Sequence, residues 1–123
     1  MLKTPKDIRQ RTFEFAVRII NLCYELDKRP GVSRNVSRQL LNAGTSVGAN
    51  AEEAQAAQSK ADFINKNSIA LKEARETHYW LKLLIAAEIM PEKKLAQLRD
   101  EAEEIKRILG SIVVSAKRTQ RAL

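Results

Sequence analysis

The sequence predicts an all-α fold, an antiparallel up-down-up-down four-helix bundle that takes up residues 1–123 as one domain. Three observations predict this fold. Apolar residues recur at alternating spacings of three and four along four segments, the period of helices packed in left-handed bundles. Proline, glycine or a capping serine marks the end of one segment and the start of the next. No segment has the alternating, turn-rich pattern of β-strands, so a sheet is not expected.

The first helix is expected to begin at Thr4, a good N-cap followed by Pro5 in the first helical position, and to end at Pro30. Cys23, the single cysteine, has apolar neighbours and is predicted to be a small core residue in a reducing cytoplasm. The N-terminus lacks the apolar core of a signal peptide, and no apolar run is long enough to span a membrane. The predicted core residues of this helix are Ile8, Thr12, Phe15, Ile19, Leu22 and Leu26.

The second and third helices share a stretch without proline, from Ser33 to Met90. Ser33 is the expected cap of the second helix, and Ser59 with Asp62 forms a capping-box-like start for the third. Nothing else marks their junction, so a very tight turn is predicted. The expected core of the second helix is Val36, Leu40, Ala43, Val47, Asn50 and Ala54. The expected core of the third is Phe63, Asn67, Ala70, Ala74, Thr77, Leu81 and Leu84.

The fourth helix is expected to open at Pro91, with Glu92 in its first turn. Its predicted core residues are Leu95, Leu98, Ala102, Ile105, Leu109, Ile112 and Ala116. Together the four segments supply more apolar surface than one bundle core needs. The first helix has a second apolar face, and the run YWLKLLIAAEIM in the third is apolar almost all round. The residues of that second face are Phe13, Val17, Ile20 and Tyr24. This excess predicts a homo-oligomer, and Gly44 and Gly48 predict a close approach of helices.

Polar residues inside the apolar seams allow three interpretations: a buried polar network, a ligand site, or a device that fixes helix register. Asn50 can bond Ser46 or Glu53, and Arg75 of the third helix can meet Glu53 across the bundle. We therefore expect a structural network, whose members are Ser46, Asn50, Glu53, Arg75 and Glu76. Register fixation is its best-fitting role, because one polar seam position can set register and oligomer state. A small-ligand pocket around Asn50 and Glu76 is the weaker alternative.

No constellation of residues predicts catalysis, so the chain is not expected to be an enzyme. A di-iron bundle needs a Glu-x-x-His motif on each of two helices, yet His78 is the single histidine. A zinc site needs about four nitrogen or sulfur ligands. Cys23 has no basic partner placed by the sequence, and there is no glycine-rich phosphate loop. We therefore predict no catalytic residues, no metal and no cofactor.

The charge pattern predicts a polyanionic partner, RNA or DNA. The chain has 22 Lys and Arg against 15 Asp and Glu, a formal charge of +7. Residues 28–51 and 105–123 contain basic residues and no acidic ones, whereas residues 92–104 are net acidic. The plainer interpretation is solubility, with basic residues suiting helix C-termini. The candidate nucleic-acid-binding residues are Arg34, Arg38, Lys106, Arg107, Lys117, Arg118 and Arg121.

The stretch from Gln39 to Leu84 resembles the small four-helix bundle proteins encoded in intervening sequences of bacterial 23S ribosomal RNA genes, also labelled S23 proteins. The family pattern reads roughly Ser-Ile-x-x-Asn-Ile-Ala-Glu-Gly, then Lys-x-Phe, then Ile-Ala and an acidic segment. The residues that match it are Ser46, Val47, Asn50, Glu53, Phe63, Ile69, Ala70 and Glu76. Ala54 stands where the family has glycine, which puts the end of the second helix in doubt.

The resemblance implies a homopentamer. It extends to the accessory variability determinant protein of diversity-generating retroelements, a basic pentameric barrel that binds nucleic acid and its reverse transcriptase. Two functions are therefore expected of this chain. The first is a non-enzymatic, oligomeric, nucleic-acid-binding bundle that contacts phosphates. The alternative is a protein–protein interaction scaffold for a larger partner such as a polymerase.

Overall fold

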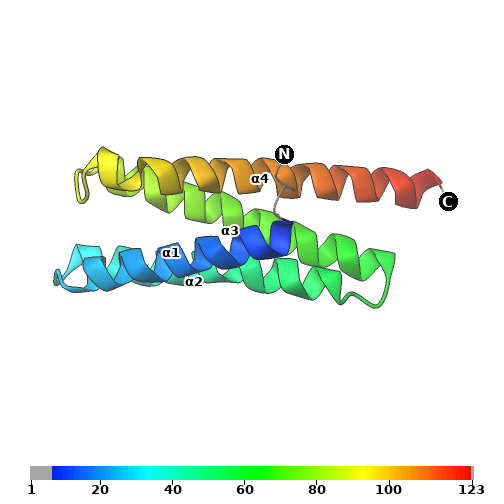
Figure 1. The fold of residues 1–123 in the computed structure, drawn as a ribbon, viewed down its shortest axis with the longest axis horizontal. Helices are drawn as coiled ribbons and strands as arrows, with labels where there is room; N and C mark the ends of the chain where they lie inside the picture. Colours follow the sequence, from blue (N-terminus) through cyan, green and yellow to red (C-terminus); the bar gives the residue numbers. More distant parts are fainter. Residues whose placement is uncertain (1–6, 123) are drawn as a thin grey trace, which may run out of the picture.

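The structure, a computed structural model, describes residues 7–122, with the side chains of residues 7–120. Four helices form an up-down bundle: α1 (Ile8–Asp27), α2 (Val32–Gln55), α3 (Lys60–Ala86) and α4 (Glu92–Ala122). Figure 1 shows the α1–α2 and α3–α4 turns at one end of the bundle, and the α2–α3 turn at the other. Each helix packs along the next in sequence, whereas α1 and α4 contact one another sparsely. The predicted fold is thus confirmed.

Local signals in the sequence explain most helix ends. The side chain of Ser59 accepts a hydrogen bond from the backbone N–H of Asp62 at 3.0 Å, which confirms the predicted start of α3. The helices α2 and α3 are joined by the predicted tight turn. The expected cap at Ser33 is wrong, because α2 already begins at Val32. Its N-cap is Gly31, whose φ of 83° is a conformation that glycine adopts without strain.

The first helix begins later than the sequence predicted. Asp7 is its N-cap and accepts a hydrogen bond from the Gln10 N–H at 3.0 Å. The carboxylate is a better cap than a hydroxyl here, because its charge also suits the helix N-terminus. The expected cap at Thr4 and the expected Pro5 lie outside the described residues. As a result α1 starts partway along the bundle, and the other three helices extend beyond it (Figure 1).

The core is the set of residues that the apolar spacing predicted. Nearly every predicted core residue is buried; Ile8, Val36, Asn50, Phe63 and Ile112 are half-buried. Cys23 is buried as expected, and its thiol donates to the Ser37 carbonyl oxygen at 3.4 Å. Burial raises the pKa of this thiol, which keeps it protonated and unreactive.

Two glycines of α2 bring α1 and α2 close together, as predicted. A Cβ placed on Gly44 would lie 2.7 Å from Cγ2 of Ile19, which is fully buried. A Cβ on Gly48 would lie 3.1 Å from the carbonyl oxygen of Thr12. These contacts leave no room for a side chain on that side of α2. They therefore fix how α1 lies against α2, and so which face of α1 points outward.

The Gly44→Ala variant should be less stable than the wild type by about 1–2 kcal/mol, measured by urea denaturation. Overpacking against the stiff, β-branched Ile19 costs about 1–3 kcal/mol, and removal of a helical glycine returns up to about 1 kcal/mol. The matched control is Gly110→Ala in α4, where a Cβ meets nothing within 4 Å. That variant should gain about 0.5–1 kcal/mol. Equal gains in both variants would refute the close approach.

Candidate functional site

The candidate nucleic-acid-binding residues fall into three separate places along the bundle. Arg34 and Arg38 lie near the start of α2, at the end that carries the α1–α2 and α3–α4 turns (Figure 1). Lys117 and Arg118 lie near the end of α4, at the opposite end. Lys106 and Arg107 lie between the ends on α4, and the side chain of Arg121 is outside the described part. The structure therefore does not gather these residues into one patch.

The three groups also differ in their partners. Glu103 engages both middle cations: its Oε2 lies 2.8 Å from Lys106 Nζ, and its Oε1 accepts from Arg107 Nε at 3.1 Å. Arg34 donates to the backbone carbonyl of Asp27 at 3.2 Å. By contrast Arg38, Lys117 and Arg118 are exposed and have no carboxylate partner among the described residues. Among these candidates, the positive charge without a carboxylate partner thus lies at the two ends of the bundle.

The end near Arg34 holds further cations that sequence reasoning missed. Lys93 and Lys94 start α4, and the α3–α4 turn lies beside the α1–α2 turn at this end (Figure 1). Arg29 ties the two turns together by donating to the carbonyl of Ile89. In the sequence the two lysines lie within residues 92–104, which are net acidic, so the charge pattern did not single them out. Only the antiparallel packing of the helices brings them to the basic turn of α1 and α2.

Carboxylates in the acidic segment of α4 form ion pairs with basic residues of the same chain. The excess positive charge of the chain therefore lies elsewhere. Arg11 of α1 donates Nε to Glu101 Oε2 at 2.9 Å and Nη2 to Glu101 Oε1 at 2.8 Å. Its Nη2 also lies 2.9 Å from Glu104 Oε2, and these bonds raise the pKa of Arg11 further. Such a two-pronged pair is among the stronger charge-assisted contacts. It fastens α1 to α4, where the two helices otherwise touch little.

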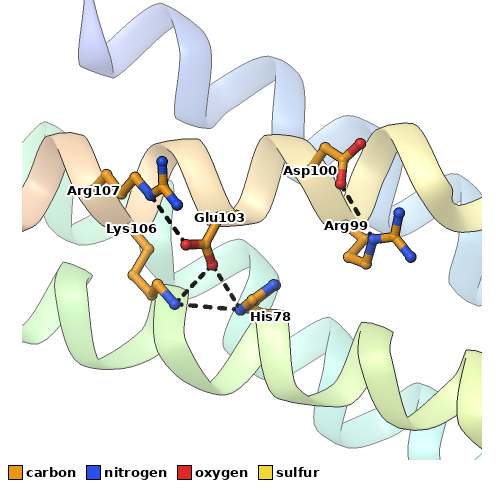
Figure 2. Close-up of polar contacts among 6 residues, drawn as sticks. All are labelled: His78, Arg99, Asp100, Glu103, Lys106 and Arg107. Carbon is orange, nitrogen blue, oxygen red and sulfur yellow. Dashed lines mark hydrogen bonds and ion pairs between the residues drawn. The ribbon is translucent and has the colours of Figure 1, made fainter.

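His78 lies between α3 and α4 in a cluster of charged groups. Its Nδ1 is 3.3 Å from Glu103 Oε2 and 3.5 Å from Lys106 Nζ (Figure 2). Arg99 lies about one turn before Glu103 on α4, and its Nε donates to Asp100 Oδ1 at 3.2 Å (Figure 2). Burial, and then the charge of Lys106, lower the pKa of His78 below its ordinary value of 6.5. His78 is therefore neutral at pH 7, when its Nδ1 can accept a hydrogen bond from Lys106.

The five residues expected to form a buried network are not connected to one another by a continuous set of hydrogen bonds. Asn50 is half-buried and donates to the carbonyl of Ser46 at 2.9 Å, the i−4 contact that was expected. Glu53 and Arg75 are exposed and make no bond with one another. Glu76 is half-buried and accepts from Trp80 Nε1 at 3.2 Å. Glu53 and Arg75 can extend into water, so neither side chain needs a protein partner.

Asn67, a predicted core residue of α3, is one of four buried polar residues in the described part of the chain, with Thr12, Ser37 and Thr77. The side chain of Asn67 is 1% exposed, and its Nδ2 donates to the Phe63 carbonyl at 3.0 Å. Its Oδ1 is buried without a hydrogen-bond partner among the described residues. Because an unpaired buried acceptor costs about 1–3 kcal/mol, this amide weakens the core that surrounds it.

Two hollows follow the seam between α1 and α4. The larger, about 560 Å³, is lined by Phe13 and Val17 of the second apolar face together with Arg11 and Arg18. The smaller, about 290 Å³, is lined by Arg18 and Lys94 among others. In the described part of the chain, no three His, Cys, Asp or Glu side chains converge as metal ligands would. Nor is any described helix long and apolar enough to cross a membrane.

The wild type should lose stability as the pH falls from about 7 to about 5.5, and His78→Gln should lose less. The unfolded chain takes up a proton near the ordinary pKa of 6.5, whereas folded His78 takes it up only at lower pH. Protonation therefore favours unfolding in this range. Urea denaturation at both pH values measures the difference. An equal loss in both proteins would contradict the placement of His78.

Asn67→Leu should stabilise the fold by about 1–3 kcal/mol, because it removes a buried acceptor that has no partner. The control is Asn65→Leu, an exposed position on the same helix, where a change within about 0.5 kcal/mol is expected. Denaturation of both variants measures this. A destabilised Asn67→Leu protein would show that Oδ1 has a partner, such as an ordered water.

Comparisons with known proteins agree with this structure. The model of the family described as 23S rRNA-intervening sequence protein matches residues 5–111. The chain is also similar to a crystal structure of a protein of unknown function from the S23 ribosomal protein family of Bacteroides thetaiotaomicron. That comparison has a TM-score of 0.80 and 46% identity, and it covers 87% of this chain and 98% of that one. None of the curated proteins compared with the chain matches it. The chain therefore belongs to the 23S rRNA-intervening sequence protein family.

Proposed function

We propose that the protein is a non-enzymatic, self-associating bundle that binds the phosphates of RNA or DNA through its two basic ends. The observation that carries the proposal is the division of charge in the structure. Carboxylates of α4 are matched by Arg11, Lys106 and Arg107, whereas Arg38, Lys117 and Arg118 have no such partner among the described residues. Unmatched cations on an exposed surface attract a polyanion and release its counterions.

Self-association is the second half of the proposal. Phe13 and Tyr24 on α1 are 69% and 71% exposed, and Tyr79 on α3 is 54% exposed. The helices α1 and α3 are not neighbours in the bundle, so their outer faces form two different surfaces. Two different surfaces favour head-to-tail contact, which closes into a ring when the rotation permits. Because the family resemblance implies a homopentamer, we propose that the ring has five subunits.

A ring strengthens the nucleic-acid hypothesis. Each copy carries a few scattered cations, which bind phosphate weakly when taken singly. Several copies held together bring many such cations to one polyanion, and their joint affinity far exceeds that of one copy. If the expected resemblance to the retroelement accessory protein holds, the nucleic-acid binding of that protein favours the same interpretation.

A protein–protein scaffold is the alternative function, favoured by the same exposed apolar surfaces. In that case the partner is a larger protein such as a polymerase, and α1 presents its apolar face to that partner. The two functions differ after nuclease treatment. A scaffold keeps its protein partner when all nucleic acid has been digested, whereas a partnership mediated by RNA or DNA is lost.

The wild type should bind a structured RNA at about 50 mM salt and bind it at least tenfold more weakly at about 200 mM. The Lys117→Gln/Arg118→Gln and Arg34→Gln/Arg38→Gln variants should bind more weakly. Their plots of log affinity against log salt should flatten by about 1 for each phosphate that the variant no longer binds. Fluorescence anisotropy with a labelled RNA hairpin and its DNA counterpart measures both effects.

The matched control removes the same charge from the middle of α4, in Lys106→Gln/Arg107→Gln. Because Glu103 already holds these two cations, their removal should reduce the affinity less than removal of the cations at either end. Absence of binding by the wild type at the lower salt would end the nucleic-acid hypothesis. Equal losses in all three variants would contradict binding by the ends.

A further inference from the structure

We propose that the α1 surface of one copy binds the α3 surface of a second copy, with Arg18 of the first paired to the acidic pair Glu73 and Glu76 of the second. The inference rests on the self-association proposed above and names the surfaces that meet. The α1 surface consists of Phe13, Val17, Arg18, Ile20 and Tyr24. The α3 surface consists of Glu73, Glu76, Tyr79, Trp80 and Leu83.

The α1 surface is an apolar ridge with a hollow and a cation beside it. The exposed fractions of Phe13, Val17, Ile20 and Tyr24 are 69%, 43%, 39% and 71%. They follow one another at spacings of four, three and four, so they share one side of the helix. Arg18 lines the same hollow as Phe13 and Val17, and it makes no hydrogen bond or ion pair with a described residue. Glu14 and Glu101 also line the hollow, but neither forms an ion pair with Arg18 that the structure shows. An apolar surface that carries negative charge would therefore complement this one.

The α3 surface offers such a partner. Tyr79 and Leu83 are 54% and 38% exposed, and the rings of Tyr79 and Trp80 meet edge to face with centroids 5.4 Å apart. Trp80 Nε1 donates to Glu76 Oε1 at 3.2 Å, which fixes the carboxylate beside the aromatic pair. Aromatic residues held rigidly next to a charged group are typical of interface centres.

The carboxylates of the α3 surface repel one another, and the charge of the neighbouring Lys72 offsets this only in part. Glu73 and Glu76 are three residues apart on one helix, an unfavourable spacing for like charges. Burial, and then the charge of Glu76, raise the pKa of Glu73, while Lys72 offsets this in part. Neither carboxylate has an ion pair with a described residue. A cation from outside the chain would relieve this repulsion.

Arginine suits this role better than lysine would. Its planar guanidinium can bond a carboxylate through two N–H groups and can stack on an aromatic ring. The α3 surface supplies both kinds of group side by side. In addition, the two surfaces lie on helices that are not neighbours in the bundle, so one copy can use both at once. This arrangement fits the closed ring of the proposed function and not a symmetric pair of α1 surfaces.

Charge reversal tests the pairing, with light scattering on Arg18→Glu, Glu76→Arg and the double variant. Each single variant places like charges together, and its apparent dissociation constant should rise about tenfold or more. The double variant restores opposite charges and should regain the wild-type mass. A mixture of the two single variants should restore contacts between unlike copies. Only the double variant should regain the full wild-type mass if the ring is a pentamer, because two variants cannot alternate around an odd number of subunits. Lys93→Glu, a charge reversal on α4 outside both surfaces, should keep the wild-type mass.

The outcomes separate this inference from the proposed function. Circular dichroism spectra and melting temperatures close to the wild type show that each variant is folded. A monomeric wild type would overturn the self-association and the pairing together. An oligomeric wild type whose mass is unchanged by both reversals would overturn the pairing alone. Dissociation by Arg18→Glu without any effect of Glu76→Arg would indicate α1 surfaces paired with each other, and so would also overturn it.

Discussion

The close contact between α1 and α2 at two glycines of α2 determines which face of α1 points outward. Because Gly44 faces Ile19 and Gly48 faces Thr12, the backbones of these helices come closer than side chains would allow. The contact turns Ile19 into the core, and the opposite side of α1 therefore faces outward. It also holds α1 close to α2, and α1 makes few contacts with α4. The two hydrogen bonds from Arg11 to Glu101 connect α1 with α4, and two hollows lie along this interface.

The same geometry separates the molecule's two kinds of surface. The middle of the bundle carries the ion pairs of α4, exposed apolar residues, and charged groups such as Arg18 and Glu76 that have no ion pair with a described residue. This composition suits contact with another protein. The ends carry cations such as Arg38 and Lys117, which have no carboxylate partner in the described part of the chain. Assembly through the middle and binding through the ends can therefore occur together, since neither surface covers the other. Because the two surfaces are separate, the proposed ring can form and bind nucleic acid at the same time.

The fold was predictable from the sequence because the core depends on spacing alone. Residues three and four apart lie on one side of a helix, so the seam of α4 could be identified without knowing its neighbours. The start of α3 at Ser59 was equally local. The start of α1 was missed because two good caps, Thr4 and Asp7, lie one turn apart. The spacing of apolar residues does not indicate which of the two caps the helix.

The candidate sites were less predictable because they depend on which helices meet. Spacing correctly placed Asn67 in the core, and it placed Asn50 near Glu53, but it could not tell that Glu53 extends into water. Nor could it bring Lys94 of α4 to the basic end of α2. The pairing of Glu103 with two of the candidate cations was visible as neighbouring residues on one helix, and that signal was overlooked.

Native mass spectrometry of the unmodified protein at low micromolar concentration tests the central claim most directly. The claim is that α1 and α3 present two surfaces that join copies of the chain. A single dominant species at a whole multiple of the 13.9 kDa chain mass, five-fold if the ring is a pentamer, is the predicted result. A spectrum with the 13.9 kDa monomer alone would contradict it.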